Sequence, residues 1–181
     1  RGPAGTWVGV RTLKPSTLIA VIRDIVNSLI RHGFDRFYFL NGHGGNIATV
    51  TAAFSEIYAQ SSMGESRAES SGVRCKIANW WEADGVMALS KELFGDADGS
   101  HATCGEVSLT QYAFPHSIKK VDMSPPIAPT GPIYDVADYR RLFPDGRIVS
   151  NPALANPEAG EKLFNKALAG IGKDYARFSK D

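Results

Sequence analysis

A short hydrophobic run followed by a glycine-rich loop and an amphipathic helix is the feature that most restricts the fold of this 181-residue chain. Residues 36–40 (RFYFL) are almost continuously apolar, as expected for a strand buried on both faces of a parallel sheet. The loop at 41–46 (NGHGGN) follows, and apolar residues then recur at helical spacing from Ile47 to Tyr58. A strand, a turn and a helix in this order form the repeating unit of an α/β domain.

The rest of the chain alternates in the same way. A strand is expected at Thr6–Val10, and a helix is expected to open at Pro15 and run through Ser16 to Arg31. The later pattern predicts a strand at 73–80 and helices at 87–93, at 102–114 and from Pro157 onward, with polar connections at 60–72 and 96–101. Half of the ten prolines lie between Pro115 and Pro132, which predicts an irregular surface stretch there. Residues 1–181 are therefore expected to form a single domain of the α/β class, a three-layer α/β/α sandwich with a mostly parallel central sheet.

Charge and composition exclude several classes of function. Lys and Arg total 20 and Asp and Glu total 19, so the net charge of +1 gives no field for general nucleic-acid binding. No apolar run is long enough to span a bilayer, so no membrane partner is expected. Cys75 and Cys104 are far apart and belong to no CxxC pair, which argues against a disulfide framework and favours a cytoplasmic location.

The loop at 41–46 is the first candidate site. Ligands of open α/β sheets bind beyond the carboxyl ends of the strands, where this loop is expected to lie. Gly42, Gly44 and Gly45 allow the backbone to take positive φ and to come close to a ligand. Three interpretations remain open: a phosphate or nucleotide on the loop amides, a metal ion on His43, or a plain turn. The Lys-Ser/Thr pair of a P-loop is missing from this segment.

A second candidate site lies in the polar segment 98–106 (DGSHATCGE). Glu106 falls early in an expected helix with small or apolar neighbours, where a carboxylate needs a cation or a donor, although it also fits a partly exposed helix position. His101 lies just before that helix and could reach the same cavity. Cys104 is expected to be a small packing residue, because a nucleophilic thiol needs a base and a lowered pKa.

Other residues with chemical potential have simpler explanations. Trp80 and Trp81 end an expected strand, where they either wall a pocket for a flat substrate or pack in the interior. His32, beside Gly33, is expected to interact with the end of a helix, and His116 is expected to be an exposed loop residue.

Several of these motifs together resemble the creatininase (creatinine amidohydrolase) family. The hexapeptide at 41–46 lies between a hydrophobic strand and an amphipathic helix, and it resembles the family signature. Gly5-Thr6 ahead of a helix opening at Pro15, the pair Trp80-Trp81, and His101-Ala102 with Glu106 and Ser108 are similar to other family motifs in the same order. The resemblance covers most of residues 2–115, with a looser match at 151–162.

The resemblance implies a metal-dependent hydrolase of non-peptide amides that contains divalent cations (Zn, Mn or Fe), often two. His43 then matches a metal ligand, and Glu106 matches a carboxylate that binds metal or its water. His101 matches the residue that contacts substrate and passes a proton to the leaving nitrogen, with Asp98 near it. Gly42, Gly44 and Trp80 are expected to contact the small amide substrate, and the family implies a homo-oligomer, often a hexamer.

The sequence departs from the family pattern in two ways. Creatinine-hydrolysing members carry an aromatic residue and a Glu where this chain has Gly44 and Gly45, which argues against creatinine as the substrate and leaves one ligand missing unless Glu106 replaces it. Family members also supply a Glu, a His and an Asp from upstream of the Gly5-Thr6 motif, at which this sequence begins. We therefore expect a chain lacking an N-terminal segment, a second chain that supplies these ligands, or an inactive scaffold.

Overall fold

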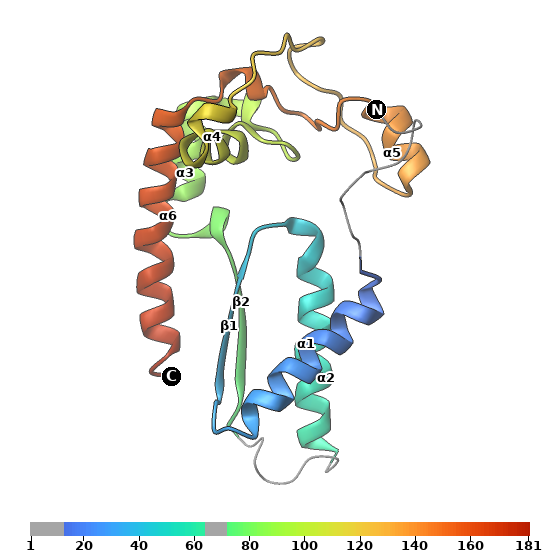
Figure 1. The fold of residues 1–181 in the computed structure, drawn as a ribbon, viewed down its shortest axis with the longest axis vertical. Coiled ribbons are helices and arrows are strands. Elements are labelled where there is room, and N and C mark those ends of the chain that lie inside the picture. The colour runs from blue at the N-terminus through green and yellow to red at the C-terminus, as the bar shows by residue number, and fades with distance from the viewer. Residues whose placement is uncertain (1–12, 64–71) are drawn as a thin grey trace. The chain divides into compact units, whose positions relative to one another are not determined.

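The structure is a computed structural model that describes residues 13–63 and 72–181, so the strand expected at 6–10 lies outside the described residues. Figure 1 shows the helices and strands, which in chain order are α1 (Pro15–Ile30), β1 (Arg36–Asn41), α2 (Ile47–Ser62), β2 (Arg74–Asn79), α3 (Val86–Phe94), α4 (Cys104–Ala113), α5 (Val136–Leu142) and α6 (Pro157–Phe178). They form two compact units, one through Asn79 together with Phe178–Asp181, and the other from Trp80 to Arg177. The prediction of one domain stays a prediction.

The first unit is built on a parallel strand pair. β1 and β2 are hydrogen-bonded in the register that runs from Arg36 opposite Arg74 to Asn41 opposite Asn79. The helices α1 and α2 pack together on one side of the pair (Figure 1). Their buried side chains form a core with β1: Ile22, Val26, Phe37, Val50, Ala53, Phe54 and Ile57. The predicted α/β class and the parallel pairing are confirmed.

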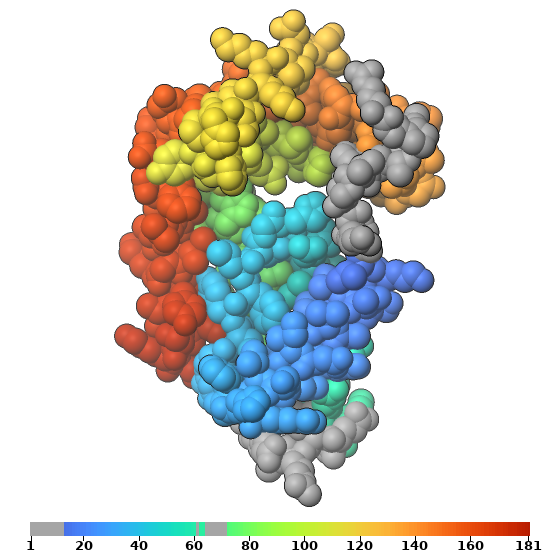
Figure 2. Space-filling model, viewed as in Figure 1, coloured from blue at the N-terminus to red at the C-terminus, as the bar shows by residue number. Residues whose placement is uncertain are grey.

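The helix α1 follows from its sequence. Pro15 occupies the first turn, where its missing N–H costs nothing, and Gly33 takes φ of 85° just beyond the helix. The space-filling view shows α1 at the surface (Figure 2). Val21, Ile25 and Leu29 form an exposed apolar row on this helix, in addition to its buried side.

The second unit has its own hydrophobic core, which three helices form between them. Buried side chains of α3, α4 and α6 pack together: Val86, Phe94, Cys104, Ala159, Leu163 and Ala167. The helix α6 starts as predicted, because the Asn156 side-chain oxygen accepts a hydrogen bond from the Ala159 N–H at 2.8 Å. Gly160 lies so close to α4 that an added Cβ would be 2.1 Å from the Ser108 carbonyl oxygen.

Some expected boundaries differ from the observed ones. The strand expected at 73–80 ends at Asn79, because Trp80 begins a 3-10 turn. The connection expected at 60–72 starts later, since α2 continues to Ser62, and the polar segment 96–101 contains a 3-10 turn through Asp98. The helix α5 was not expected, whereas the stretch from Pro115 to Pro132 is irregular apart from one turn, as predicted. In the described residues, no helix combines the length and the apolar character needed to span a membrane.

Candidate functional site

In the first unit, the loop that carries His43 is held by one buried side chain. Asn41, the last residue of β1, is 6% exposed. Its Nδ2 donates to the His43 carbonyl at 2.9 Å and to Oδ1 of Asn79 at 2.7 Å. Its Oδ1 accepts from the His43 N–H at 3.2 Å and from Nδ2 of Asn46 at 3.2 Å. The Asn41 amide therefore ties both strand ends to the backbone of His43.

The glycines of this loop do not take left-handed angles. Positive φ angles occur elsewhere in the described chain, so Gly42, Gly44 and Gly45 do not use the freedom that a glycine has. The reason is that residues 44–46 form a 3-10 turn that leads directly into α2, and such a turn uses right-handed angles. At Gly45 an added Cβ would lie 2.8 Å from Nε2 of His43, so the ring would have to move to make room for it. The exposed His43 ring thus lies across the space that a side chain at position 45 would fill.

In the second unit, Glu106 closes the first turn of α4. Its Oε2 accepts a hydrogen bond from the Thr103 N–H at 3.0 Å, while Oγ1 of Thr103 accepts from the Glu106 N–H at 3.0 Å. This reciprocal pair is a capping box, which satisfies donors at the helix start. The other carboxylate oxygen, Oε1, is not used by the box.

Asp98 also supports the start of α4. Its Oδ1 accepts from the Gly105 N–H at 2.9 Å and its Oδ2 accepts from the Ser90 hydroxyl at 2.6 Å. The carboxylate thereby connects α3 to the first turn of α4, where a negative charge also interacts favourably with the helix dipole. Both of its oxygens thus have structural partners, although a carboxylate keeps further acceptor capacity.

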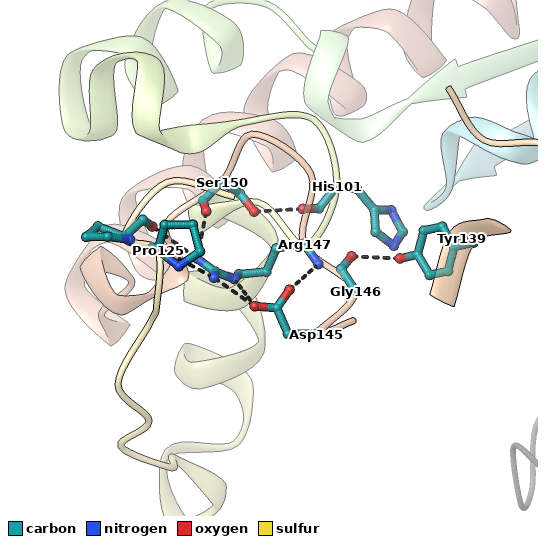
Figure 3. Close-up of polar contacts among 8 residues, drawn as sticks. His101, Pro125, Tyr139, Asp145, Gly146, Arg147 and Ser150 are labelled. Atoms are coloured by element: carbon teal, nitrogen blue, oxygen red, sulfur yellow. Dashed lines mark hydrogen bonds and ion pairs between the residues drawn. The ribbon is translucent and has the colours of Figure 1, made fainter. Parts of the chain in front are cut away.

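His101 is fixed by an isolated antiparallel bridge rather than by a helix. Its N–H donates to the Ile148 carbonyl at 3.3 Å, and the Ile148 N–H donates back to the His101 carbonyl at 3.2 Å. The imidazole meets the Tyr139 ring edge to face, with 5.9 Å between ring centroids (Figure 3). His101 therefore has an ordered backbone and an aromatic neighbour close to the first turn of α4.

Trp80 and Cys104 contribute to the interior of the second unit. Trp80 is partly buried against the core and meets Trp81 edge to face, with ring centroids 6.1 Å apart. Cys104 is fully buried, and this burial raises the pKa of its thiol to about 11. The expectation that Cys104 is a packing residue is confirmed, because its side chain is fully buried in the core of the second unit.

The expected site residues fall in both units. Gly42, His43 and Gly44 belong to the first, whereas Trp80, Asp98, His101 and Glu106 belong to the second. Asp98, His101 and Glu106 all lie at or just before the first turn of α4. Within residues 13–63 and 72–181, no three His, Cys, Asp or Glu side chains are grouped so that they could hold a metal ion.

Sequence reasoning missed four residues that organise these segments, namely Asn41, Tyr139, Arg147 and Ser150. Asn41 carries a signal, since an amide that ends a buried strand must find partners. Tyr139 and Ser150 contact His101 from 38 or more positions further along the chain, and Arg147 binds the Ser150 carbonyl. No local pattern indicates such contacts.

Comparisons with known proteins give the family and the fold of this chain. The family model described as creatinine amidohydrolase matches residues 2–174. A curated creatinine amidohydrolase from Pseudomonas putida is 24% identical over 178 residues, and the match spans 66% of that protein. A solved creatinine amidohydrolase structure superposes with a TM-score of 0.75 at 21% identity, over 94% of this chain and 66% of the other.

A second solved structure, described as a creatininase with Mn, gives a TM-score of 0.72 at 21% identity, over 93% of this chain and 66% of the other. These structural likenesses show that the chain has the creatininase fold, and the family model covers nearly all of it. The chain therefore belongs to the creatininase (creatinine amidohydrolase) family.

Proposed function

We propose that this protein is a metal-dependent amidohydrolase that hydrolyses a non-peptide C–N bond of the cyclic amide or formamide type. The observation that carries the proposal is the family match over residues 2–174, which includes both the His43 loop and the first turn of α4. Among the solved creatininases, one is described as complexed with creatine, one with Mn and one as a Zn–Zn type. A small amide substrate and divalent cations are consistent with those descriptions.

The available donors suit such cations. Imidazole and carboxylate are ligands that Zn²⁺ and Mn²⁺ both accept, and His43 and Glu106 provide one of each. We assign His43 and Glu106 each as a candidate ligand of a divalent cation, which is Zn, Mn or Fe, with two cations in the complete site. Bound cations would supply an activated water and polarise the amide carbonyl.

The side chains of the second unit have distinct proposed roles. His101 holds the proton that is delivered to the leaving nitrogen, which is the usual function of an imidazole in amide cleavage. Glu106 keeps α4 capped with Oε2, and Oε1 is the oxygen we assign to metal or to its water. Gly42, Gly44, Trp80 and Asp98 are the proposed substrate contacts.

The competing phosphate-binding function has less support. It requires backbone N–H groups of the 41–46 loop to face an anion. The His43 N–H is already donated to Asn41, and the Asn46 N–H is donated to the His43 carbonyl at 3.1 Å. A homo-oligomeric assembly and a cytoplasmic location stay predictions.

The proposal is tested by metal analysis of the complete protein. Wild type, His43→Ala and His32→Ala are purified in parallel, and bound metal is measured by inductively coupled plasma mass spectrometry. His32 is an exposed histidine just after α1 and serves as the matched control. We expect His43→Ala to lose metal and hydrolysis of a panel of cyclic amides and formamides, and His32→Ala to retain both.

A second variant separates folding from chemistry at Glu106. Glu106→Gln keeps an acceptor for the Thr103 N–H, since Gln also fits a capping box, but it removes the charge. We expect normal thermal stability with greatly reduced hydrolysis. Full activity in this variant, or unchanged metal content in His43→Ala, would count against the proposal.

A further inference from the structure

We infer that Arg147 is a positioning residue for His101: its buried guanidinium fixes the segment 145–150, and that segment holds both the backbone and the ring of His101. This inference rests on the proposed catalytic role of His101. The hydrogen bonds of the Arg147 side chain go to other residues than His101 and the residues assigned to metal or substrate.

The Arg147 side chain is only 3% exposed, and all of its N–H groups have hydrogen-bond or ion-pair partners. Nε donates to Oδ2 of Asp145 at 2.8 Å, and Nη2 lies 2.7 Å from the same oxygen. Nη1 donates to the carbonyls of Pro126 and Ser150, at 3.0 and 3.2 Å, and Nη2 also donates to the carbonyl of Pro125 at 3.0 Å. An arginine has five N–H donors, so this side chain fixes the directions of three backbone carbonyls and one carboxylate at once.

The segment held by Arg147 in turn clamps the backbone of His101 (Figure 3). Ser150, which is fully buried, donates its hydroxyl to the His101 carbonyl at 2.8 Å. Ile148 exchanges two backbone hydrogen bonds with His101, and its carbonyl also accepts from the Ser100 N–H at 3.0 Å. Ile148 and Ser150 thus form a clamp on the His101 backbone. Arg147 precedes Ile148 in the chain and donates to the Ser150 carbonyl, so it is connected to both residues of this clamp.

The same segment also anchors the ring of His101. Tyr139, whose ring meets the imidazole edge to face, donates its hydroxyl to the Gly146 carbonyl at 2.7 Å (Figure 3). Gly146 lies between Asp145 and Arg147, so a shift of the guanidinium displaces the carbonyl that holds Tyr139. Backbone and ring of His101 therefore depend on one short segment.

Backbone strain marks this bridge as a position under constraint. In the described residues, Ala102 and Val149 are the non-glycine residues with positive φ, at 51° and 52°, and they follow the two bridged residues directly. Such angles cost energy for residues with a Cβ and persist where the surroundings enforce them. Gly99 also has no room for a side chain, because an added Cβ would be 2.2 Å from the Val149 carbonyl oxygen. The clamp thus holds His101 in a geometry that the local sequence does not favour.

The test follows the His101 ring rather than activity alone. Ser150→Ala, Arg147→Lys and Arg147→Met are compared with Arg141→Met, which removes an exposed arginine of α5 paired to Asp138. Imidazole ¹H–¹⁵N correlation spectra of the complete protein are recorded at one pH, and the His101 signals are assigned with His101→Gln. Far-UV circular dichroism establishes that each variant is folded.

We expect Ser150→Ala and Arg147→Met to shift or split the His101 ring signals, and Arg147→Lys to do so to a smaller extent. Arg141→Met is expected to leave them in place, and the His32 and His116 signals should not move in any variant. Arg147→Lys keeps a positive charge at this position, so it carries the test if Arg147→Met does not fold, and Ser150→Ala shows how far the signals move when the hydrogen bond to the His101 carbonyl is lost. Folded variants with lowered thermal stability and unchanged His101 signals would overturn the inference, because Arg147 would then serve stability alone.

The activity of His101→Gln separates this inference from the proposed function. If that variant hydrolyses amides at the wild-type rate, the catalytic role of His101 fails. The ring spectra still decide whether Arg147 positions it.

Discussion

The strongest test of the first unit is removal of the Asn41 side chain. Asn41→Ala deletes four hydrogen bonds that connect β1, β2 and the His43 loop. At a net ~1 kcal/mol for each bond the upper figure is ~4 kcal/mol, and because the loop is exposed, water replaces part of this and leaves a loss of ~2–3 kcal/mol. The variant should therefore unfold at a clearly lower urea concentration.

The control lies in the same unit. Asn27 of α1 donates a single side-chain bond, to Oε1 of Gln60 at 3.0 Å. Asn27→Ala should cost only about 0–1 kcal/mol, since the loss of one bond is opposed by the better helix propensity of Ala. Both variants are measured by urea unfolding followed by far-UV circular dichroism, with the slope of the free energy against urea compared between them.

A double-mutant cycle locates the effect. Asn41→Ala and Asn79→Ala remove the two partners of the 2.7 Å bond separately and together. Their destabilisations should not add, with a coupling of about 0.5–1.5 kcal/mol, because each single change already breaks the shared bond. The reasoning is refuted if Asn41→Ala lowers the free energy of unfolding no more than Asn27→Ala does, or if the destabilisations of Asn41→Ala and Asn79→Ala simply add. The Asn41 hydrogen bonds would then not be a source of stability.

Three further changes test the second unit. Leu163→Ala removes a fully buried side chain and should cost ~2–5 kcal/mol in thermal unfolding, whereas Leu168→Ala, 59% exposed on the same helix, should change stability by less than about 1 kcal/mol. Because burial raises the pKa of Cys104 to about 11, only about one thiol in a thousand is ionised at pH 8. A thiol reagent should therefore modify Cys104 only after denaturation, and fast labelling of Cys104 in the native protein, mapped by mass spectrometry, would contradict this. Thr103→Ala should lower stability by ~1 kcal/mol through loss of the cap on Glu106, and Thr103→Ser should restore most of it in the same melting assay.

Elements with strong local signals could be predicted from the sequence. Pro15 and the apolar period of α1 define one helix, and Asn156 with Pro157 defines the start of α6. The helix α5 escaped prediction because it has seven residues and no buried side chain to create an apolar period. Its signal is the cap, since Asp135 Oδ1 accepts from the Asp138 N–H at 2.9 Å.

The candidate site was predictable in its residue types but not in its contacts. The pattern Thr103-x-x-Glu106 is a capping-box signature, so the structural role of Glu106 could have been derived from spacing alone. The role of Arg147 could not, because its partners at 125 and 126 lie more than 20 positions away. Long-range side-chain networks depend on tertiary packing, which local patterns do not contain.

The position of α4 depends on the absence of a side chain at Gly160, a residue of α6 that carries no polar side-chain group. A methyl group there would meet the Ser108 carbonyl, two residues beyond Glu106, and would force the helix pair apart. Replacement of Gly160 by alanine thus offers a way to displace Glu106 mechanically while every candidate ligand and proton donor stays chemically intact. Such a substitution would disturb the placement of Glu106 and leave its chemistry unchanged.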